Sequence, residues 1–335
     1  MKRQLTKQKF TIWEKLMLSP EFGILVPVLI MCAIAYAMNH NFLKITNIAY
    51  IINTSAFYGF LALAECVVQL TGDTDLSVGM SGAISSVIVG VAAQTWGLSP
   101  IVALLCGIAM GALVGLVNGL ISAKFGLSLW ITSLATQFMC NGFAQFISMG
   151  KPFKFGNEAF ADAYTAIANF KNWVIPKIGI NTTFLIFLLL TAVLHFVVHK
   201  TQFGYKLRAV GGNKDAALLA GINVSNIKLI ACILAGAICG VYGGAVVLKQ
   251  LSTNIQQGQG GEFRAITCCA IGGITAGAGS VWSVFMGVLL FHFVNGALQS
   301  MGADNNVQLA MVGALLLFAV LLNVFRQSYM KKKTI

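Results

Sequence analysis

The chain has 335 residues, of which 57% are hydrophobic and 10% are charged, and its mean hydropathy is +0.81. These values exclude an ordinary soluble globular protein. The formal net charge of +12 is explained by the basic cytoplasmic loops of a membrane protein, so nucleic acid is not expected as a partner. The eight cysteines lie in or beside apolar runs and are interpreted as small buried hydrophobic residues.

Continuous apolar runs predict an all-α polytopic membrane protein. Most of the runs have about 17 to 25 residues, the length that crosses a hydrocarbon core of roughly 30 Å, whereas strands of a barrel would alternate. The glycine- and serine-rich runs 78–95 and 265–277 are candidates for broken or re-entrant helices. The ten predicted spans are 22–38, 48–70, 78–95, 100–122, 128–148, 182–199, 227–248, 265–277, 281–299 and 307–326.

The distribution of lysine and arginine predicts the orientation of a single membrane domain, 1–335. Residues 9–19 alternate charged and apolar side chains, which suits a short interfacial helix, so 1–20 is predicted to be a cytoplasmic or interfacial segment. The larger share of basic residues falls on one side of the predicted spans. We therefore expect both termini and loop 200–227 in the cytoplasm, and loop 150–181 on the periplasmic side.

A weak internal repeat is present in the sequence. A shift of 177 residues lays VNGL, 117–120, on VNGA, 294–297, and superimposes three pairs of predicted spans. Because this shift crosses an odd number of membrane passes, the two halves would have opposite orientations, as in many transporters. A chance register is the alternative.

Loop 200–227 contains a charged segment that predicts a short capped helix. Asn213 is a good N-cap, Asp215 suits the positive end of the helix dipole, and Gly221 supplies the stop. A helix of about two turns is not stable alone, so membrane-end loops or a docked partner must hold it. A simple polar connector is the alternative. The residues assigned to this element are Gly211, Gly212, Asn213, Asp215, Ala216, Ala217, Leu218, Leu219 and Gly221.

Several polar side chains fall at membrane depth or beside the predicted spans. Such groups face a cavity, line a pathway or hydrogen-bond between helices, and Asp75 and Ser77 can instead cap the following helix. The candidates for the translocation pathway are Glu65, Asp75, Ser77, Asn141, Glu262, His292 and Asn295.

Motifs of enzymes and of nucleotide-binding proteins are missing from the sequence. His195 and His199 have the spacing of a metal pair, but they belong to no HExxH pattern, and an interfacial role is preferred. No G-x-x-x-x-G-K-[ST] sequence occurs. We therefore expect no catalytic residue, no metal and no cofactor bound by this chain.

Three stretches closely resemble the permease subunits of ribose- and galactose-type ABC sugar importers, and the likeness covers most of the chain. In the third stretch, Gly261 stands where the family has Tyr and Arg264 where it has Asp. The matching residues are Thr71, Gly72, Asp75, Leu76, Ser77, Val78 and Gly79; then Thr201, Gly204, Ala209, Gly211, Gly212, Asn213, Ala216, Ala217, Gly221, Ile222, Asn223 and Val224; then Gly258, Gly260, Glu262, Ala265, Ile266, Gly272 and Gly273.

The resemblance implies a type II ABC importer-like fold with an inverted repeat. It also implies that the short helix of 213–221 is a coupling helix that docks into a cytosolic ABC ATPase, which would bind ATP and Mg. The other implied partners are a second permease subunit, a periplasmic or lipid-anchored solute-binding protein, and the lipids of the bacterial cytoplasmic (inner) membrane. The implied solute is small and polar, a monosaccharide. An ion-coupled secondary transporter and an intramembrane enzyme are the alternatives.

Overall fold

The computed structural model describes residues 20–154, 162, 165, 179–253 and 255–334, and within them the secondary structure is helical apart from two isolated bridges. The predicted interfacial helix at 9–19 and most of loop 150–181 lie outside the described residues. The elements are α2 (Pro20–Met38), α3 (Ile45–Gln69), α4 (Val78–Gln94), α5 (Pro100–Phe125), α6 (Leu129–Ser148), α9 (Thr182–Lys200), α10 (Gln202–Gly212), α11 (Lys214–Leu219), α12 (Val224–Gln250), η1 (Gln256–Gly258), α13 (Gly261–Ile271), α14 (Val281–Ser300) and α15 (Asn305–Thr334).

Each of the ten predicted ranges overlaps one of these helices. Of the described helices, α3, α5, α9, α12 and α14 are long and apolar enough to cross a membrane. Shorter apolar helical segments are Val28–Met38, Val78–Gln94 and Asn306–Leu322. The coarse prediction of an all-helical membrane protein is therefore confirmed.

The two glycine-rich runs behave differently from each other. Helix α4 is continuous over Val78–Gln94, so the irregular backbone lies in the loop before it. Helix α13 ends at Ile271, and the predicted range 265–277 was wrong at its C-terminal end. Gly273 and Gly277 have φ values of +69° and +72°, which a helix does not contain. At about 1.5 Å per residue, α13 covers only about half of a hydrocarbon core.

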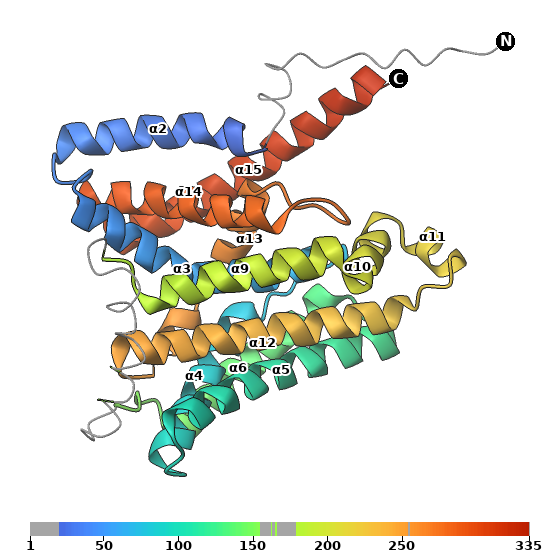
Figure 1. The fold of residues 1–335 in the computed structure, drawn as a ribbon, viewed down its shortest axis with the longest axis horizontal. Helices are drawn as coiled ribbons and strands as arrows, with labels where there is room; N and C mark the ends of the chain where they lie inside the picture. The colour runs from blue at the N-terminus through green and yellow to red at the C-terminus, as the bar shows by residue number, and fades with distance from the viewer. Residues whose placement is uncertain (1–19, 155–161, 163–164, 166–178, 254, 335) are drawn as a thin grey trace.

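Helices α5 and α12 form the closest pair in the bundle, and they run side by side in Figure 1. Their contact rests on glycine. A Cβ atom on Gly111 would lie 2.2 Å from the Gly236 carbonyl oxygen, and one on Gly115 would lie 2.1 Å from the Cys232 carbonyl oxygen. Small residues at four-residue spacing let the two backbones approach, as is typical of helix packing in membranes.

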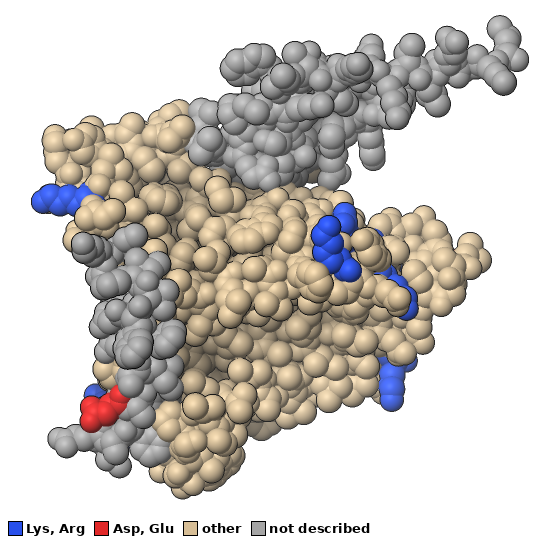
Figure 2. Space-filling view, viewed as in Figure 1, with Lys and Arg blue, Asp and Glu red and all other residues tan. Residues whose placement is uncertain are grey.

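Helix α3 is central to the bundle, because it packs against four other helices: α9, α12, α13 and α14. Its residues from Ser55 to Val68 are almost all buried. By contrast, α5 and α6 present large exposed apolar side chains such as Ile101 and Phe146. In Figure 2, the middle of the visible face is uncharged and the described charges lie toward its ends. Such an apolar outer surface suits contact with lipid.

The two ends of the bundle can be told apart in Figure 1. Helix α11 projects at one end, and the start of α2 and the C-terminal end of α15 lie toward the same end. The α2–α3 connection and the C-terminal end of α12 lie at the opposite end. The positions of α11 and of the chain ends are thus compatible with one shared side.

Candidate functional site

The short helix predicted at 213–221 is present as α11, Lys214–Leu219. The Asn213 side chain accepts a hydrogen bond from the Ala216 amide at 2.9 Å, and Gly221 ends the element with φ +78°. Leu218 is 51% exposed and Leu219 is 91% exposed. The predicted cap, stop and apolar surface are confirmed as geometry, and two adjacent leucines face outward from a polar loop.

Helix α10 connects α11 to a loop junction, defined here as Leu70, Arg208, Gly211 and Gly277. The Gly277 amide donates to the Leu70 carbonyl at 3.1 Å, and Arg208 Nε donates to the Gly277 carbonyl at 3.4 Å. A Cβ atom on Gly211 would lie 2.0 Å from the Leu70 oxygen and 2.6 Å from the Gly277 nitrogen. The loop junction thus joins α10 to the loops before α4 and after α13 through backbone atoms.

Two side-chain contacts reinforce the loop junction. Arg208 Nη1 donates to His199 Nδ1 at 3.2 Å, which gives His199 a structural partner at the end of α9. Lys228 Nζ lies 2.6 Å from Asp73 Oδ2 and ties the start of α12 to the loop before α4. The sequence analysis did not predict this ion pair. Among the described residues, no group of three or more potential ligands could hold a metal ion.

A buried polar network brings together three of the predicted pathway residues, Glu65, Asp75 and Ser77. The Asp75 amide donates to Glu65 Oε2 at 3.2 Å. Asp75 Oδ1 accepts from the Ser77 amide at 2.8 Å and from Ser77 Oγ at 2.6 Å. Asn118 Nδ2 of α5 donates to Ser77 Oγ at 2.9 Å. The Asp75 carboxylate therefore receives the free amide before α4, as the capping alternative expected, whereas the Ser77 side chain makes no cap bond.

Glu262 lies where the N-terminal ends of α4 and α13 meet. A Cβ atom on Gly79 would be 2.2 Å from the Gly258 oxygen and 3.0 Å from Glu262 Oε2. Glu262 is buried, and its Oε1 accepts from Gln137 Nε2 at 2.9 Å. Its Oε2 has no hydrogen-bond partner within the described parts of the chain. Glu262 therefore joins α13 to α6 rather than to the Glu65 network.

Asn141 remains apart from the other predicted pathway residues. It accepts a hydrogen bond from Gln145 Nε2 on its own helix at 2.9 Å and is half-buried. Gln137 of the same helix bonds instead to Glu262 of α13.

His292 belongs to a third cluster, which joins α3, α13 and α14. Its ring stacks on Tyr58 with centroids 5.6 Å apart, and its Nδ1 donates to the Val288 carbonyl at 2.9 Å. The Arg264 guanidinium lies 4.6 Å from the Tyr58 ring centroid and donates to the Tyr58 hydroxyl. Sequence reasoning missed Tyr58 as a partner and noted Arg264 only as a departure from a motif. Asn295, three residues further along α14, is half-buried.

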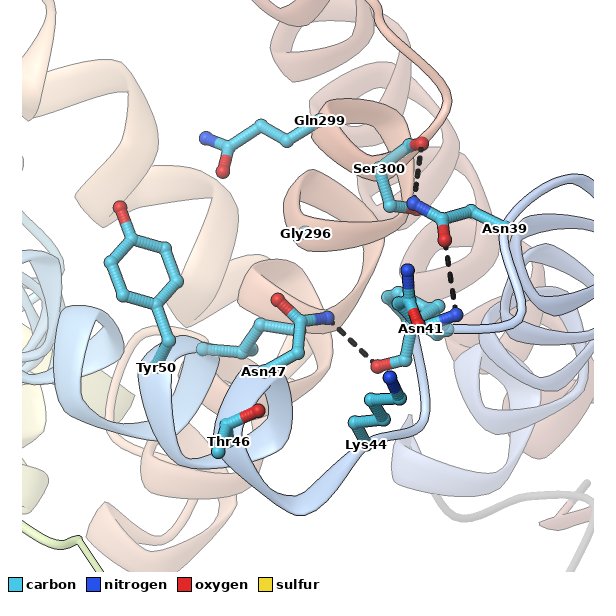
Figure 3. Close-up of a pocket in the computed structure, with 11 residues that line it drawn as sticks. Asn39, Asn41, Lys44, Thr46, Asn47, Tyr50, Gly296, Gln299 and Ser300 are labelled. Atoms are coloured by element: carbon cyan, nitrogen blue, oxygen red, sulfur yellow. Dashed lines mark hydrogen bonds between the residues drawn. The ribbon is translucent and has the colours of Figure 1, made fainter.

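A polar pocket of about 290 Å³ opens where the α2–α3 connection meets the end of α14. Figure 3 shows Tyr50 and Asn47 from α3 and Gln299 from α14 directed toward the same space. Asn39 and Asn47 hold the connecting loop through bonds to the Ser300 and Phe42 carbonyls. The pocket therefore presents amide, hydroxyl and ammonium groups on a fixed backbone.

Known proteins resemble this chain over nearly its whole length. The family described as "Branched-chain amino acid transport system / permease component" matches residues 47–320. The "Ribose import permease protein RbsC" of Bacillus subtilis (strain 168) is 30% identical over 327 residues, covering 95% of this chain and 96% of the relative. No solved structure matches the chain significantly.

Two further relatives have comparable similarity. RbsC of Escherichia coli (strain K12) is 28% identical over 311 residues, covering 90% of this chain and 93% of the relative. The "Galactose/methyl galactoside import permease protein MglC" of Salmonella typhimurium is 29% identical over 353 residues, covering 98% of this chain and 99% of the relative.

Proposed function

This chain belongs to the family of branched-chain amino acid transport system permease components, and on that premise we propose that it is the transmembrane permease subunit of an ATP-binding-cassette importer. Its solute is small and polar, of the monosaccharide class, because the relatives carry the names of ribose and galactose import permeases. The observation that carries the proposal is α11, a capped helix whose exposed Leu218 and Leu219 need a partner.

The coupling route begins at α11 and passes through the loop junction. A cytosolic ABC ATPase, which binds ATP and Mg, docks onto α11 by contacting Leu218 and Leu219. Movement of α11 displaces α10. Gly211 of α10 packs directly against the backbone of Leu70 and Gly277, so the displacement reaches both loops. The loops before α4 and after α13 then move together, because the Gly277 amide donates to the Leu70 carbonyl and Gly211 packs against both residues.

The importer contains further proteins. A second permease subunit completes the pathway in the lipid of the bacterial inner membrane, and a periplasmic or lipid-anchored solute-binding protein delivers the solute. Both chain ends and α11 are cytoplasmic in this proposal, and loop 150–181 is periplasmic. The excess of lysine and arginine on the α11 side supports this orientation.

Ten membrane crossings and an inverted repeat belong to the same proposal. If α3, α4, α5 and α6 correspond to α12, α13, α14 and α15, the packing of each half should repeat in the other. Three contacts of one half have their counterpart in the described helices. The pair α3–α13 corresponds to α12–α4, the pair α4–α6 to α13–α15, and the pair α5–α12 to α14–α3. This pattern of contacts supports the repeat that the VNG register suggested.

The docking role of α11 is tested by the double substitution Leu218→Asp and Leu219→Asp. An unpaired carboxylate in an apolar cleft costs several kcal/mol, so co-purification of the ATPase is expected to fall by about tenfold or more. Lys214→Asp is the matched control, because it adds an acidic group to the same helix at an exposed position without removing a leucine. Unchanged ATPase binding by the double variant contradicts the proposal.

The energy source is tested separately with the complete importer in proteoliposomes. Uptake is expected to require ATP and the ATPase subunit, and the permease purified alone is expected to hydrolyse no ATP. Abolition of uptake by a protonophore at constant ATP would instead support the ion-coupled secondary transporter.

A further inference from the structure

Arg264 lies near mid-depth of the bundle. Arg264 contacts Tyr58 of α3. Along the axis of α3, Tyr58 lies about 18 Å from Leu70 of the loop junction, at a helical rise of about 1.5 Å per residue. His292, which stacks on Tyr58, lies about 17 Å along α14 from the start of that helix at Val281, by the same rise. Against a hydrocarbon core of about 30 Å, the three residues are close to the middle.

Arg264 interacts electrostatically with the Glu262 carboxylate but forms no close ion pair with it. Among the described residues no carboxylate oxygen lies within 4.0 Å of its guanidinium, whose contacts are the Tyr58 hydroxyl and ring. Glu262, the nearest acidic residue in sequence, bonds to Gln137 of α6 and faces α4. An arginine at membrane depth costs about 2.5 to 3.5 kcal/mol on insertion scales, so such residues usually mark a functional site.

Two lysines lie beside α3, the helix that Arg264 contacts. Lys249 Nζ lies 4.5 Å from the ring centroid of Phe57, the residue before Tyr58 on α3. Lys44 lines the pocket of Figure 3. Neither segment 39–64 nor α14 contains an aspartate or a glutamate. Neither segment therefore adds a negative charge to that of Glu262 near Arg264.

A stripe of polar residues leads from the pocket to Arg264. On α3, Asn47, Tyr50, Thr54 and Tyr58 follow one another at three- and four-residue spacing, and on α14 the corresponding residues are His292, Asn295 and Gln299. We name these seven residues the α3–α14 seam. Its outer members line the pocket, and its inner member Tyr58, which stacks on His292, contacts Arg264.

We propose that Arg264 is an anion-recognition residue and that the transported solute is a sugar bearing one negatively charged group, a carboxylate or a phosphate. The inference rests on the proposed importer function and narrows its substrate class. The guanidinium offers planar paired donors to such an oxyanion. The amides and hydroxyls along the α3–α14 seam suit the hydroxyl groups of the same solute.

The test is initial ATP-driven uptake by the complete importer, with its ATPase and its companion binding protein, in proteoliposomes. The panel contains D-galacturonate, D-gluconate and D-galactose 6-phosphate, each compared with its neutral parent sugar. The wild type should take up at least one anionic sugar about tenfold faster than its parent, a difference of about 1.4 kcal/mol. Arg264→Gln should abolish that preference, and Arg264→Lys should retain part of it.

The controls separate this inference from a structural role of Arg264 and from the proposed function. Lys206→Gln removes an exposed cation on α10 and should leave the preference unchanged. The membrane content of the Arg264→Gln complex should equal that of the wild type, which shows that the variant folds and assembles. The inference is overturned if ATP drives the uptake of neutral sugars alone or of no sugar in the panel. It is also overturned if the preference for anionic sugars survives Arg264→Gln. Uptake without ATP overturns the proposed importer function instead.

Discussion

The loop junction and the α3–α14 seam are built from different parts of the chain. At the loop junction, glycines bring backbone atoms of α10 and two loops into direct contact. Along the α3–α14 seam, helices present amide, hydroxyl and aromatic side chains to a pocket and to Arg264. A backbone contact transmits displacement regardless of side-chain chemistry, whereas recognition of a solute depends on that chemistry. The two regions should therefore respond differently to substitution.

The largest effect is expected from Gly211→Ala at the loop junction. The added methyl group would lie 2.0 Å from the Leu70 oxygen, and such overpacking costs about 1 to 3 kcal/mol or more. The clash should push α10 away from the two loops and weaken the coupling. Since about 1.4 kcal/mol corresponds to a factor of ten, ATP-driven uptake should fall by about tenfold or more. Gly212→Ala is the matched control, because nothing lies within 4 Å of its Cβ position. Equal activity of the two variants would contradict a direct backbone contact.

An intermediate effect is expected from Tyr58→Leu in the α3–α14 seam. This change removes the ring beneath Arg264, and a cation–π contact contributes about 0.5 to 2 kcal/mol. The thermal unfolding midpoint of the purified complex should fall by a few degrees. Tyr58→Phe keeps the ring and should recover most of that loss. A midpoint for Tyr58→Phe as low as that for Tyr58→Leu would show that the hydroxyl, and not the ring, holds the arginine.

The smallest effect is expected from Lys228→Gln beside the loop junction. Lys228 and Asp73 are each only 19% exposed at their side chains, and even so a single ion pair near the surface contributes about 1 kcal/mol or less. Denaturation in detergent should show a small loss that 1 M salt reduces only in part, because partly buried pairs are screened much less than exposed ones. Lys206→Gln, exposed on α10, is the control. A loss as large as that of Gly211→Ala would mean that side chains also carry the coupling.

Local patterns allowed much of the fold and the family to be predicted. Apolar runs predicted where the helices lie, because a segment that crosses lipid must satisfy its own backbone. Asn213, Asp215 and Gly221 predicted α11, because caps and stops act within one turn. The family likeness carried by the three motifs is confirmed by the match over residues 47–320. The inverted repeat and the ten crossings stay predictions.

Partnerships between distant segments were much harder to predict. Glu65 and Asp75 were each singled out, but their hydrogen bond depends on how the loop before α4 folds back on α3. Nothing in the sequence around Gln137 predicts that it bonds to Glu262 of α13. Arg264 was visible only as a departure from a motif, because nothing in its neighbours in sequence reveals Tyr58 or His292.

The sequence by itself thus determined a helical membrane protein with a short capped helix on a basic loop, since these features follow from hydropathy and from interactions a few residues apart. Only the tertiary structure decided that Leu70, Gly211 and Gly277 meet, and that Arg264 of α13 lies against Tyr58 of α3. The physical reason is that helix packing is set by shape. Glycines and small side chains allow close approach at many positions, and only the assembled bundle selects which of them are in contact.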